Sequence, residues 1–417
     1  MDSSGADVAD IPTSEPEVKP ASQAVDYREY IGQFVRGPPT ESFEDNLLPE
    51  YKYITSWPSA GWTNDVMTYA NLIHLALLTQ RIPILPPFAP SHLSLSAGFP
   101  PVCEVFDIPR LSKELGIPIL EWRDVKDEAS EAWDVLGCWS TWSTWHESER
   151  PSIVLSELKL DVSYTGVPDS FKLFPQDVRD PHVSLNKIMQ LAFPSVRKSA
   201  LQKHHPAPAR LSGLSLEPSE HLLCYDYLYY TSVDTYYEWW QDWSPQWRLV
   251  GTHMHWRERV DRIAKEYLMR HFGTEDVDSL PPFIVIHARR GDFLGQCETA
   301  NVDCLPTLAQ MKTKVEQMQI ALAEKGIVTD HVLVTSDETD PGWWAAIVEL
   351  GWTHIDHTAF RTEARFGKWY GPILDAAFHS MGAAVIGTER STMSLLGERR
   401  AHDWQDAPTT RLMLMEP

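Results

Sequence analysis

Two adjacent arginines follow a strongly apolar segment in the second half of the chain. The segment Phe283–Ala288 (FIVIHA) is typical of a buried strand, and His287, Arg289, Arg290 and Asp292 lie at its end. Ligands of doubly wound α/β domains bind beyond the carboxyl ends of strands. A guanidinium donates paired hydrogen bonds to a diphosphate and keeps its charge. We therefore predict an anion site with Arg289 as its cation, and with Asp292 orienting that arginine or meeting a ligand hydroxyl. The alternative is a surface Arg–Asp pair that only caps the strand.

Polar residues follow two further expected strands in this half. Asp337 comes directly after the strand expected over 331–336, and Ser391 and Thr392 come after the strand expected over 383–388. Hydroxyl groups and backbone N–H groups at a helix start form a phosphate site. Taken singly, however, such residues are more often helix caps.

Two weaker signals complete the set. Asp375 lies on the helix expected over 373–380, where a carboxylate can bind a ligand or simply form an ion pair. In the first half, Gly61 and Asn64 lie in the turn between an expected strand and helix (SWPSAGWTND). Glycine lets a ligand approach the backbone, and an amide both donates and accepts hydrogen bonds. Because turns are rich in Gly and Asn, this pair carries little weight alone.

Alternating strands and helices must position these residues. A strand over 51–57, a helix over 63–79 and a strand over 82–88 form a βαβ unit, which predicts a parallel sheet. A second alternating block begins near residue 255. We therefore predict an α/β protein with two Rossmann-like, doubly wound lobes that face a cleft, residues 46–250 and 251–417.

Other segments have weaker patterns. Residues 138–220 are rich in Pro, Ser and Trp and are expected to form loops and short elements. The aromatic segment 224–243 is expected to pack between the lobes. Residues 1–45 are rich in Pro, Ser and acidic residues and poor in large apolar ones, so we expect a disordered acidic tail.

Composition excludes several classes of protein. The chain has 417 residues and a net charge of -22, from 36 Lys plus Arg and 58 Asp plus Glu. Such a surface repels nucleic acid and anionic lipid. We find no apolar run of the ~20 residues that a membrane span needs, and no secretory signal at the start. Among five cysteines, Cys297 and Cys304 are separated by six residues and either form a disulfide or remain two free thiols.

Taken together and in this order, the segments resemble the GDP-fucose protein O-fucosyltransferase family and, more distantly, the core fucosyltransferases. The family's GxxNQ motif is similar to residues 61–65, with Asp65 in place of glutamine. Its HxRxxD, (T/S)D and final Asp…Ser/Thr motifs are similar to the following residues: His287, Arg289 and Asp292; Ser336 and Asp337; Asp375, Ser391 and Thr392.

The resemblance implies a GT-B fold, GDP-fucose as donor, inversion at the anomeric carbon and no metal cofactor. It implies catalytic roles for Arg289, on the β-phosphate, and for Asp292. It also implies that these residues bind the donor: Gly61, Asn64, His287, Arg289, Asp337, Asp375, Ser391 and Thr392. Some members have a candidate general base, a glutamate, at the position that Gly61 occupies here. The proton then goes to Asp65, Asp292 or Glu298, or the reaction depends on leaving-group stabilisation.

We therefore predict an inverting glycosyltransferase that moves fucose from GDP-fucose to an acceptor hydroxyl, with protein Ser or Thr favoured and a glycan or small molecule open. One alternative is a non-catalytic protein that binds a GDP-sugar or a partner on the same fold. Another is a transferase for a different nucleotide sugar. The expected partners are GDP-fucose and an acceptor protein or glycan, without nucleic acid. The resemblance alone implies the secretory lumen.

Overall fold

Two parallel sheets organise the computed structural model, which describes residues 22–296 and 304–414. The first sheet has six strands in the order β3-β2-β1-β7-β4-β5, and the second has four in the order β10-β9-β11-β12. Every strand pair in both sheets is parallel. The predicted α/β class with parallel sheets is therefore confirmed.

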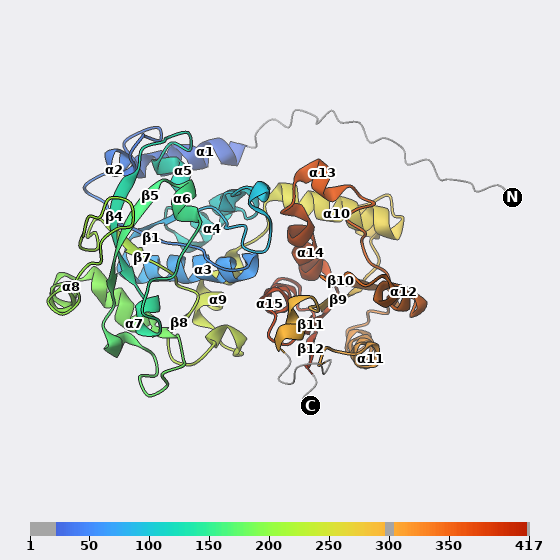
Figure 1. Ribbon diagram of the computed structural model, residues 1–417. Coiled ribbons are helices and arrows are strands. Elements are labelled where there is room, and N and C mark those ends of the chain that lie inside the picture. Colours follow the sequence, from blue (N-terminus) through green and yellow to red (C-terminus); the bar gives the residue numbers. More distant parts are fainter. Residues whose placement is uncertain (1–21, 297–303, 415–417) are drawn as a thin grey trace.

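The first sheet and its helices occupy the first 250 residues, coloured blue to yellow-green in Figure 1. This half also contains a separate two-stranded parallel sheet, formed by β6 and β8. The elements are α1 (Ser22–Ile31), α2 (Phe43–Asn46), β1 (Tyr53–Ser56), α3 (Trp62–Thr79), β2 (Ile82–Leu85), α4 (Ile108–Leu115), β3 (Leu120–Glu121), α5 (Trp122–Val125), β4 (Asp134–Ser140), α6 (Val154–Glu157), β5 (Leu160–Gly166), β6 (Val183–Ser184), α7 (Leu185–Ile188), α8 (Pro194–Leu201), β7 (Leu222–Tyr225), β8 (Thr231–Ser232) and α9 (Pro245–Leu249).

The second sheet and its helices follow, coloured yellow to red in Figure 1. The elements are α10 (Glu258–Phe272), β9 (Ile284–Ala288), α11 (Leu308–Glu324), β10 (Val332–Ser336), α12 (Pro341–Glu349), α13 (Thr362–Phe366), α14 (Tyr370–Met381), β11 (Ala384–Thr388), α15 (Thr392–Gln405) and β12 (Thr409–Leu412). The strands and helices predicted here from periodicity are present at nearly the predicted bounds. The prediction did not include β12.

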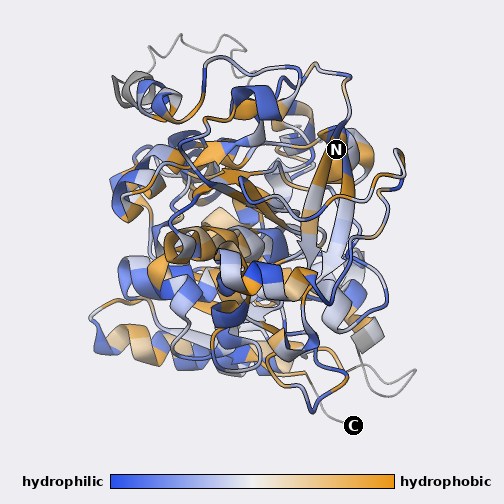
Figure 2. Ribbon diagram, turned by 90° about the vertical axis from the view of Figure 1, so that its left-hand side faces the viewer, coloured by the Kyte–Doolittle hydropathy of each residue, from blue (hydrophilic) through white to orange (hydrophobic). Residues whose placement is uncertain are grey.

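Strand alternation divides the apolar residues into three cores. In β1, Tyr53 faces a core on the outer side of the first sheet, and Ile54 faces a core shared with the second half. In β9, Ile284 and Ile286 face the outer core of the second sheet, and Val285 faces the shared one. Figure 2 shows the hydrophobic residues gathered in the strands and along helices next to them. The shared core packs α3 and α15 together and so holds the two sheets in one arrangement.

The prediction of a disordered tail is wrong for its described part, which begins at residue 22. Residues 22–46 contain α1 and α2, and Ile31, Val35 and Phe43 are buried in the outer core of the first sheet. These few apolar residues are enough because they cover a face that the sheet leaves open, so burial offsets the ordering entropy. Residues 1–21 lie outside the described residues.

The segment predicted as mixed loops contains two long strands. β4 and β5 pair along their whole length, and β7 lies between β1 and β4 at the centre of the sheet. The aromatic segment 224–243 therefore begins inside the sheet, although its Trp239 does reach the shared core. Cys138 on β4 and Cys224 on β7 form a disulfide that the sequence analysis did not predict. For Cys297 and Cys304 the sequence left a disulfide and two free thiols open, and Cys297 lies outside the described residues.

Candidate functional site

The ends of three neighbouring strands bring the predicted anion site together. The backbone N–H of Arg289 donates to Thr388 Oγ1 at 3.0 Å, and that hydroxyl donates to His287 O at 2.8 Å, so β9 and β11 end side by side. The Arg289 guanidinium then binds two carboxylates. Its Nε lies 2.8 Å from Asp292 Oδ1, and its Nη1 lies 2.9 Å from Asp337 Oδ2. Three predicted residues, Arg289, Asp292 and Asp337, thus form one cluster.

Asp337 is held in place independently of Arg289. Its Oδ1 accepts hydrogen bonds from the backbone N–H groups of Arg290, at 2.8 Å, and Gly291, at 3.1 Å. A Cβ on Gly291 would lie 2.7 Å from Asp337 Oδ2, so only glycine lets the loop approach this closely. Asp337 would therefore keep its position if Arg289 bound a ligand instead.

Arg290 does not contribute a second cation to the site. Its Nε lies 2.6 Å from Glu338 Oε2, and its guanidinium lies over the Trp343 ring at 5.2 Å. The hydrogen bond from Arg290 holds the pKa of Glu338 below its ordinary value. The two arginines together face three carboxylates, so a bound anion must compete with Asp292 and Asp337 for Arg289.

His287 supports the site from behind instead of facing a ligand. Its side chain is buried, and its Nδ1 lies 2.7 Å from Ser394 Oγ on α15. Burial, with the charge of Arg289, lowers the pKa of His287 to about 3. Burial and neighbouring His287 likewise lower the pKa of His379 to about 3. Both imidazoles are therefore neutral at physiological pH and act as uncharged packing and hydrogen-bonding groups.

These two histidines should make the free energy of unfolding decrease at acidic pH. Their pKa is depressed in the folded state, so below pH ~6.5 the unfolded chain binds protons that the folded chain does not. The free energy of unfolding should then fall as the pH drops from ~6.5 toward ~3, by up to ~1.4 kcal/mol per pH unit for each histidine.

Denaturant titrations between pH 7.5 and 5 measure that slope. His287→Gln should reduce it, whereas His205→Gln, a change at an exposed histidine after α8, should leave it unaltered. Equal slopes in wild type and His287→Gln would contradict the assignment.

The start of α15, in the second half of the chain, contacts the start of α3, in the first half. Ser391 caps α15 by accepting a hydrogen bond from Ser394 N at 3.4 Å. Thr392 Oγ1 donates to Asn64 Oδ1 at 2.7 Å and also lies 2.7 Å from Thr63 Oγ1. The predicted residues Asn64, Ser391 and Thr392 therefore converge, although Asn64 is 328 residues from Thr392.

Asp65 is sealed inside the protein and is not available to an acceptor. Its Oδ1 accepts from the N–H groups of Ser59 and Ala60, each at 3.2 Å, and its Oδ2 has no hydrogen-bond partner in the described structure. Complete burial raises the pKa of Asp65 well above its ordinary value. The residue therefore fixes the β1–α3 turn, and the prediction that it could serve as general base is wrong. Glu298, another candidate, lies outside the described residues.

Asp375 forms an ion pair, as one of its two predicted roles, with His357, a partner that the sequence did not identify. Its Oδ1 lies 3.0 Å from His357 Nε2, and His357 Nδ1 lies 3.0 Å from Thr362 Oγ1. Burial alone would lower the pKa of His357, but the hydrogen bond and charge of Asp375 outweigh it and raise that pKa. The second oxygen of Asp375 makes no hydrogen bond to any residue in the described ranges, so it can accept one from a ligand.

Several supporting residues were missed by sequence reasoning. Thr388, Ser394 and His357 join the predicted residues to one another. Ser391 and Ser394 stand three residues apart at a helix start, a capping pattern that local rules can find. No local pattern points to Thr388 or His357, because their partners come from other elements.

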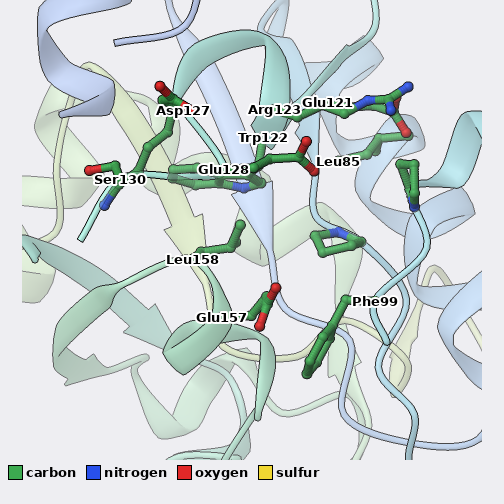
Figure 3. Close-up of a pocket in the computed structure, with 13 residues that line it drawn as sticks. Leu85, Phe99, Glu121, Trp122, Arg123, Asp127, Glu128, Ser130, Glu157 and Leu158 are labelled. Atoms are coloured by element: carbon green, nitrogen blue, oxygen red, sulfur yellow. The ribbon is translucent and has the colours of Figure 1, made fainter. Parts of the chain in front are cut away.

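A separate hollow lies in the first half, at the edge of the main sheet (Figure 3). It has a volume of about 50 Å³ beside β3 and α5, and none of the predicted site residues lines it. Two of its charged groups are already neutralised, since Arg123 Nε lies 3.1 Å from Glu121 Oε2 and Lys126 Nζ lies 2.8 Å from Asp134 Oδ2. We therefore place the candidate site at the strand ends and not here.

Two further properties concern the described residues only. Within residues 22–296 and 304–414, no group of three or more His, Cys, Asp and Glu side chains is placed to hold a metal ion. None of the helices in these ranges has the length and apolar character that crossing a membrane requires.

Comparison with known proteins shows a shared fold. No protein-family model matches the sequence, and no curated protein does. The crystal structure of POFUT1 in complex with GDP is 15% identical and superposes with a TM-score of 0.55, covering 87% of this chain and 98% of that one. The POFUT1 complex with GDP-fucose gives 14% identity and a TM-score of 0.54, with 89% and 99% coverage. The chain thus has the mixed α/β, parallel-sheet fold of the POFUT1 structures over most of its length.

Proposed function

We propose that the protein is a GT-B glycosyltransferase of the fucosyltransferase superfamily that uses GDP-fucose and inverts the anomeric carbon. The observation that carries this proposal is the cluster at the end of β9, where the backbone N–H of Arg289 donates to Thr388 on β11, the strand that leads into α15. A guanidinium at a strand end, together with a helix N-terminus, suits a diphosphate leaving group. The fold shared with POFUT1 supports the same proposal.

The leaving group is where this chain can contribute most to the rate. As the bond from C1 to the β-phosphate breaks, negative charge accumulates on GDP. Arg289 exchanges Asp292 and Asp337 for the phosphate, and the hydroxyl and N–H groups at the start of α15 add further donors. Donors fixed where charge develops usually make the largest contribution to such reactions.

A donor screen tests the proposal directly. The protein is incubated with GDP-fucose, GDP-mannose, UDP-glucose and UDP-N-acetylglucosamine, and the released nucleoside diphosphate is measured. We expect release from GDP-fucose and tighter binding of GDP than of UDP in isothermal titration. Release from a UDP-sugar alone would favour a transferase for another nucleotide sugar.

A second candidate, a non-catalytic GDP-sugar-binding protein, is favoured by one observation. The position expected to hold a base is Gly61, and the two described carboxylates proposed as substitutes are both engaged, Asp65 in the β1–α3 turn and Asp292 on Arg289. GDP binding without any release of GDP from GDP-fucose would support this candidate.

Turnover should survive removal of divalent metal. The positive charge comes from the guanidinium of Arg289, which needs no metal, and from the α15 N-terminus. Activity in excess EDTA should therefore match activity in Mn²⁺ within about twofold, with folding checked by circular dichroism. Complete loss in EDTA that stoichiometric Mn²⁺ restores, without unfolding, would contradict the arginine mechanism.

We further propose that the protein works in an oxidising compartment such as the secretory lumen. The Cys138–Cys224 disulfide supports this, because disulfides persist mainly in such compartments. Non-reducing peptide mapping of protein isolated from its own cells tests it, and free thiols at both positions would contradict it.

A further inference from the structure

The loop between β2 and α4 carries His92 to the beginning of α3. A Cβ on Gly61, the residue that precedes α3, would lie 2.7 Å from both Cδ2 and Nε2 of the His92 ring. The imidazole therefore occupies the space that a side chain at position 61 would need. Gly61 stands three residues before Asn64, which binds the start of α15 through Thr392.

Contacts from the second half of the molecule hold this loop. Lys368 Nζ donates to Ser94 Oγ and Ser96 Oγ, each at 2.9 Å, and Trp369 Nε1 donates to Gly98 O at 3.1 Å. The position of His92 thus depends on both halves, as is expected of a group that acts where they meet.

The imidazole of His92 is not engaged by other side chains in the described part of the chain. His92 is exposed and has no hydrogen bond or ion pair with any residue in 22–296 or 304–414. The charged groups on the elements that meet here are Asp65 on α3, Arg150, which binds the β1–α3 turn through Ser59, and Lys368. Imidazole is the side chain best suited to general base catalysis near neutral pH.

We propose that His92 is the general base that accepts the proton of the attacking hydroxyl, a role that rests on the proposed function. The acceptor O–H proton passes to the free imidazole nitrogen, and the acceptor oxygen forms a bond to C1 of fucose. The bond from C1 to the β-phosphate oxygen breaks, and its electron pair leaves with GDP. The products are the fucoside, GDP and an imidazolium that releases its proton to water.

Hydrolysis of GDP-fucose, in which water is the acceptor, tests this role without a known acceptor. GDP release is measured from pH 5 to 9 for wild type, His92→Gln and His92→Ala, and GDP affinity is measured by titration. His205→Gln is the matched control, since that histidine is exposed and lies outside the site.

We expect His92→Gln to bind GDP within about twofold of wild type and to hydrolyse the donor ~100-fold more slowly. The rise in rate with pH that wild type shows should vanish in His92→Gln, and added imidazole should restore part of the activity of His92→Ala. His205→Gln should behave as wild type.

Two different failures remain distinguishable. If the wild-type protein releases no GDP from GDP-fucose, the proposed function is wrong, and the role of His92 falls with it. If the wild-type protein turns over and His92→Gln keeps its rate and pH profile, only the role of His92 is wrong.

Discussion

Replacing Arg289 with alanine should slow donor turnover ~100-fold or more while the protein stays folded. The Arg289 side chain is 25% exposed, so its removal opens no cavity in a core. Asp337 loses its ion pair with Arg289 but keeps the hydrogen bonds from the N–H groups of Arg290 and Gly291. The fold should thus tolerate the change, and the loss should fall on the leaving-group step.

Arg289→Lys should also fail substantially. An ammonium is a point charge and cannot reach both carboxylates, or a diphosphate, with a planar fork of donors. Arg110→Ala is a matched control, since Arg110 is an exposed arginine on α4 that pairs with Glu114 at 3.5 Å. Release of GDP from GDP-fucose is the readout. Near wild-type release by Arg289→Ala would remove the arginine from the mechanism.

The position of the site could be predicted from the sequence because it depends on a local rule. Strand ends are marked by apolar runs that stop, and the chemistry follows within a few residues, as with Arg289 after β9 and Thr392 after β11. The pairing of Arg289 with Asp337 could not be predicted. It depends on the register of β9 against β10, where Ala288 lies beside Ser336.

The missed strands show where periodicity fails. β4 (DVLGCWS) and β5 (LDVSYTG) mix polar and apolar residues, so neither an alternating nor a continuous apolar pattern is clear. Two of their buried serines form hydrogen bonds with distant partners. Ser140 Oγ donates to Asp226 Oδ2 at 2.6 Å, and Ser163 Oγ donates to Ala207 O at 2.7 Å. Partners that lie 86 and 44 residues away leave no mark on a local pattern.

The two halves differ in predictability for a related reason. The second sheet consists of short apolar strands between clearly periodic helices, so each element could be located separately. The first half depends on contacts made by chain segments with weak patterns, such as the turn fixed by Asp65 and the loop that carries His92. The candidate general base therefore emerged only from the structure.

The geometry around Asp375 favours a role in choosing the base of the nucleotide. One oxygen is held by His357, which Thr362 holds in turn, and Thr362 Oγ1 lies 3.0 Å from Tyr267 OH. A chain of this kind fixes the carboxylate in one orientation while its second oxygen stays open. Guanine offers a ring N–H and an exocyclic amine side by side to such an acceptor, and uracil does not.

Asp375→Ala should therefore weaken GDP binding ~10- to 100-fold and reduce the preference for GDP over UDP. A charge-assisted hydrogen bond contributes ~1.5–3 kcal/mol, and ~1.4 kcal/mol corresponds to one decade of affinity. His357→Gln should give a smaller loss of the same kind, because it loosens the carboxylate without removing it. Glu349→Ala, a change at an exposed carboxylate on α12, should alter neither affinity nor preference. Competition titrations with GDP and UDP decide the matter: an undiminished preference for GDP in Asp375→Ala would assign base recognition to another residue.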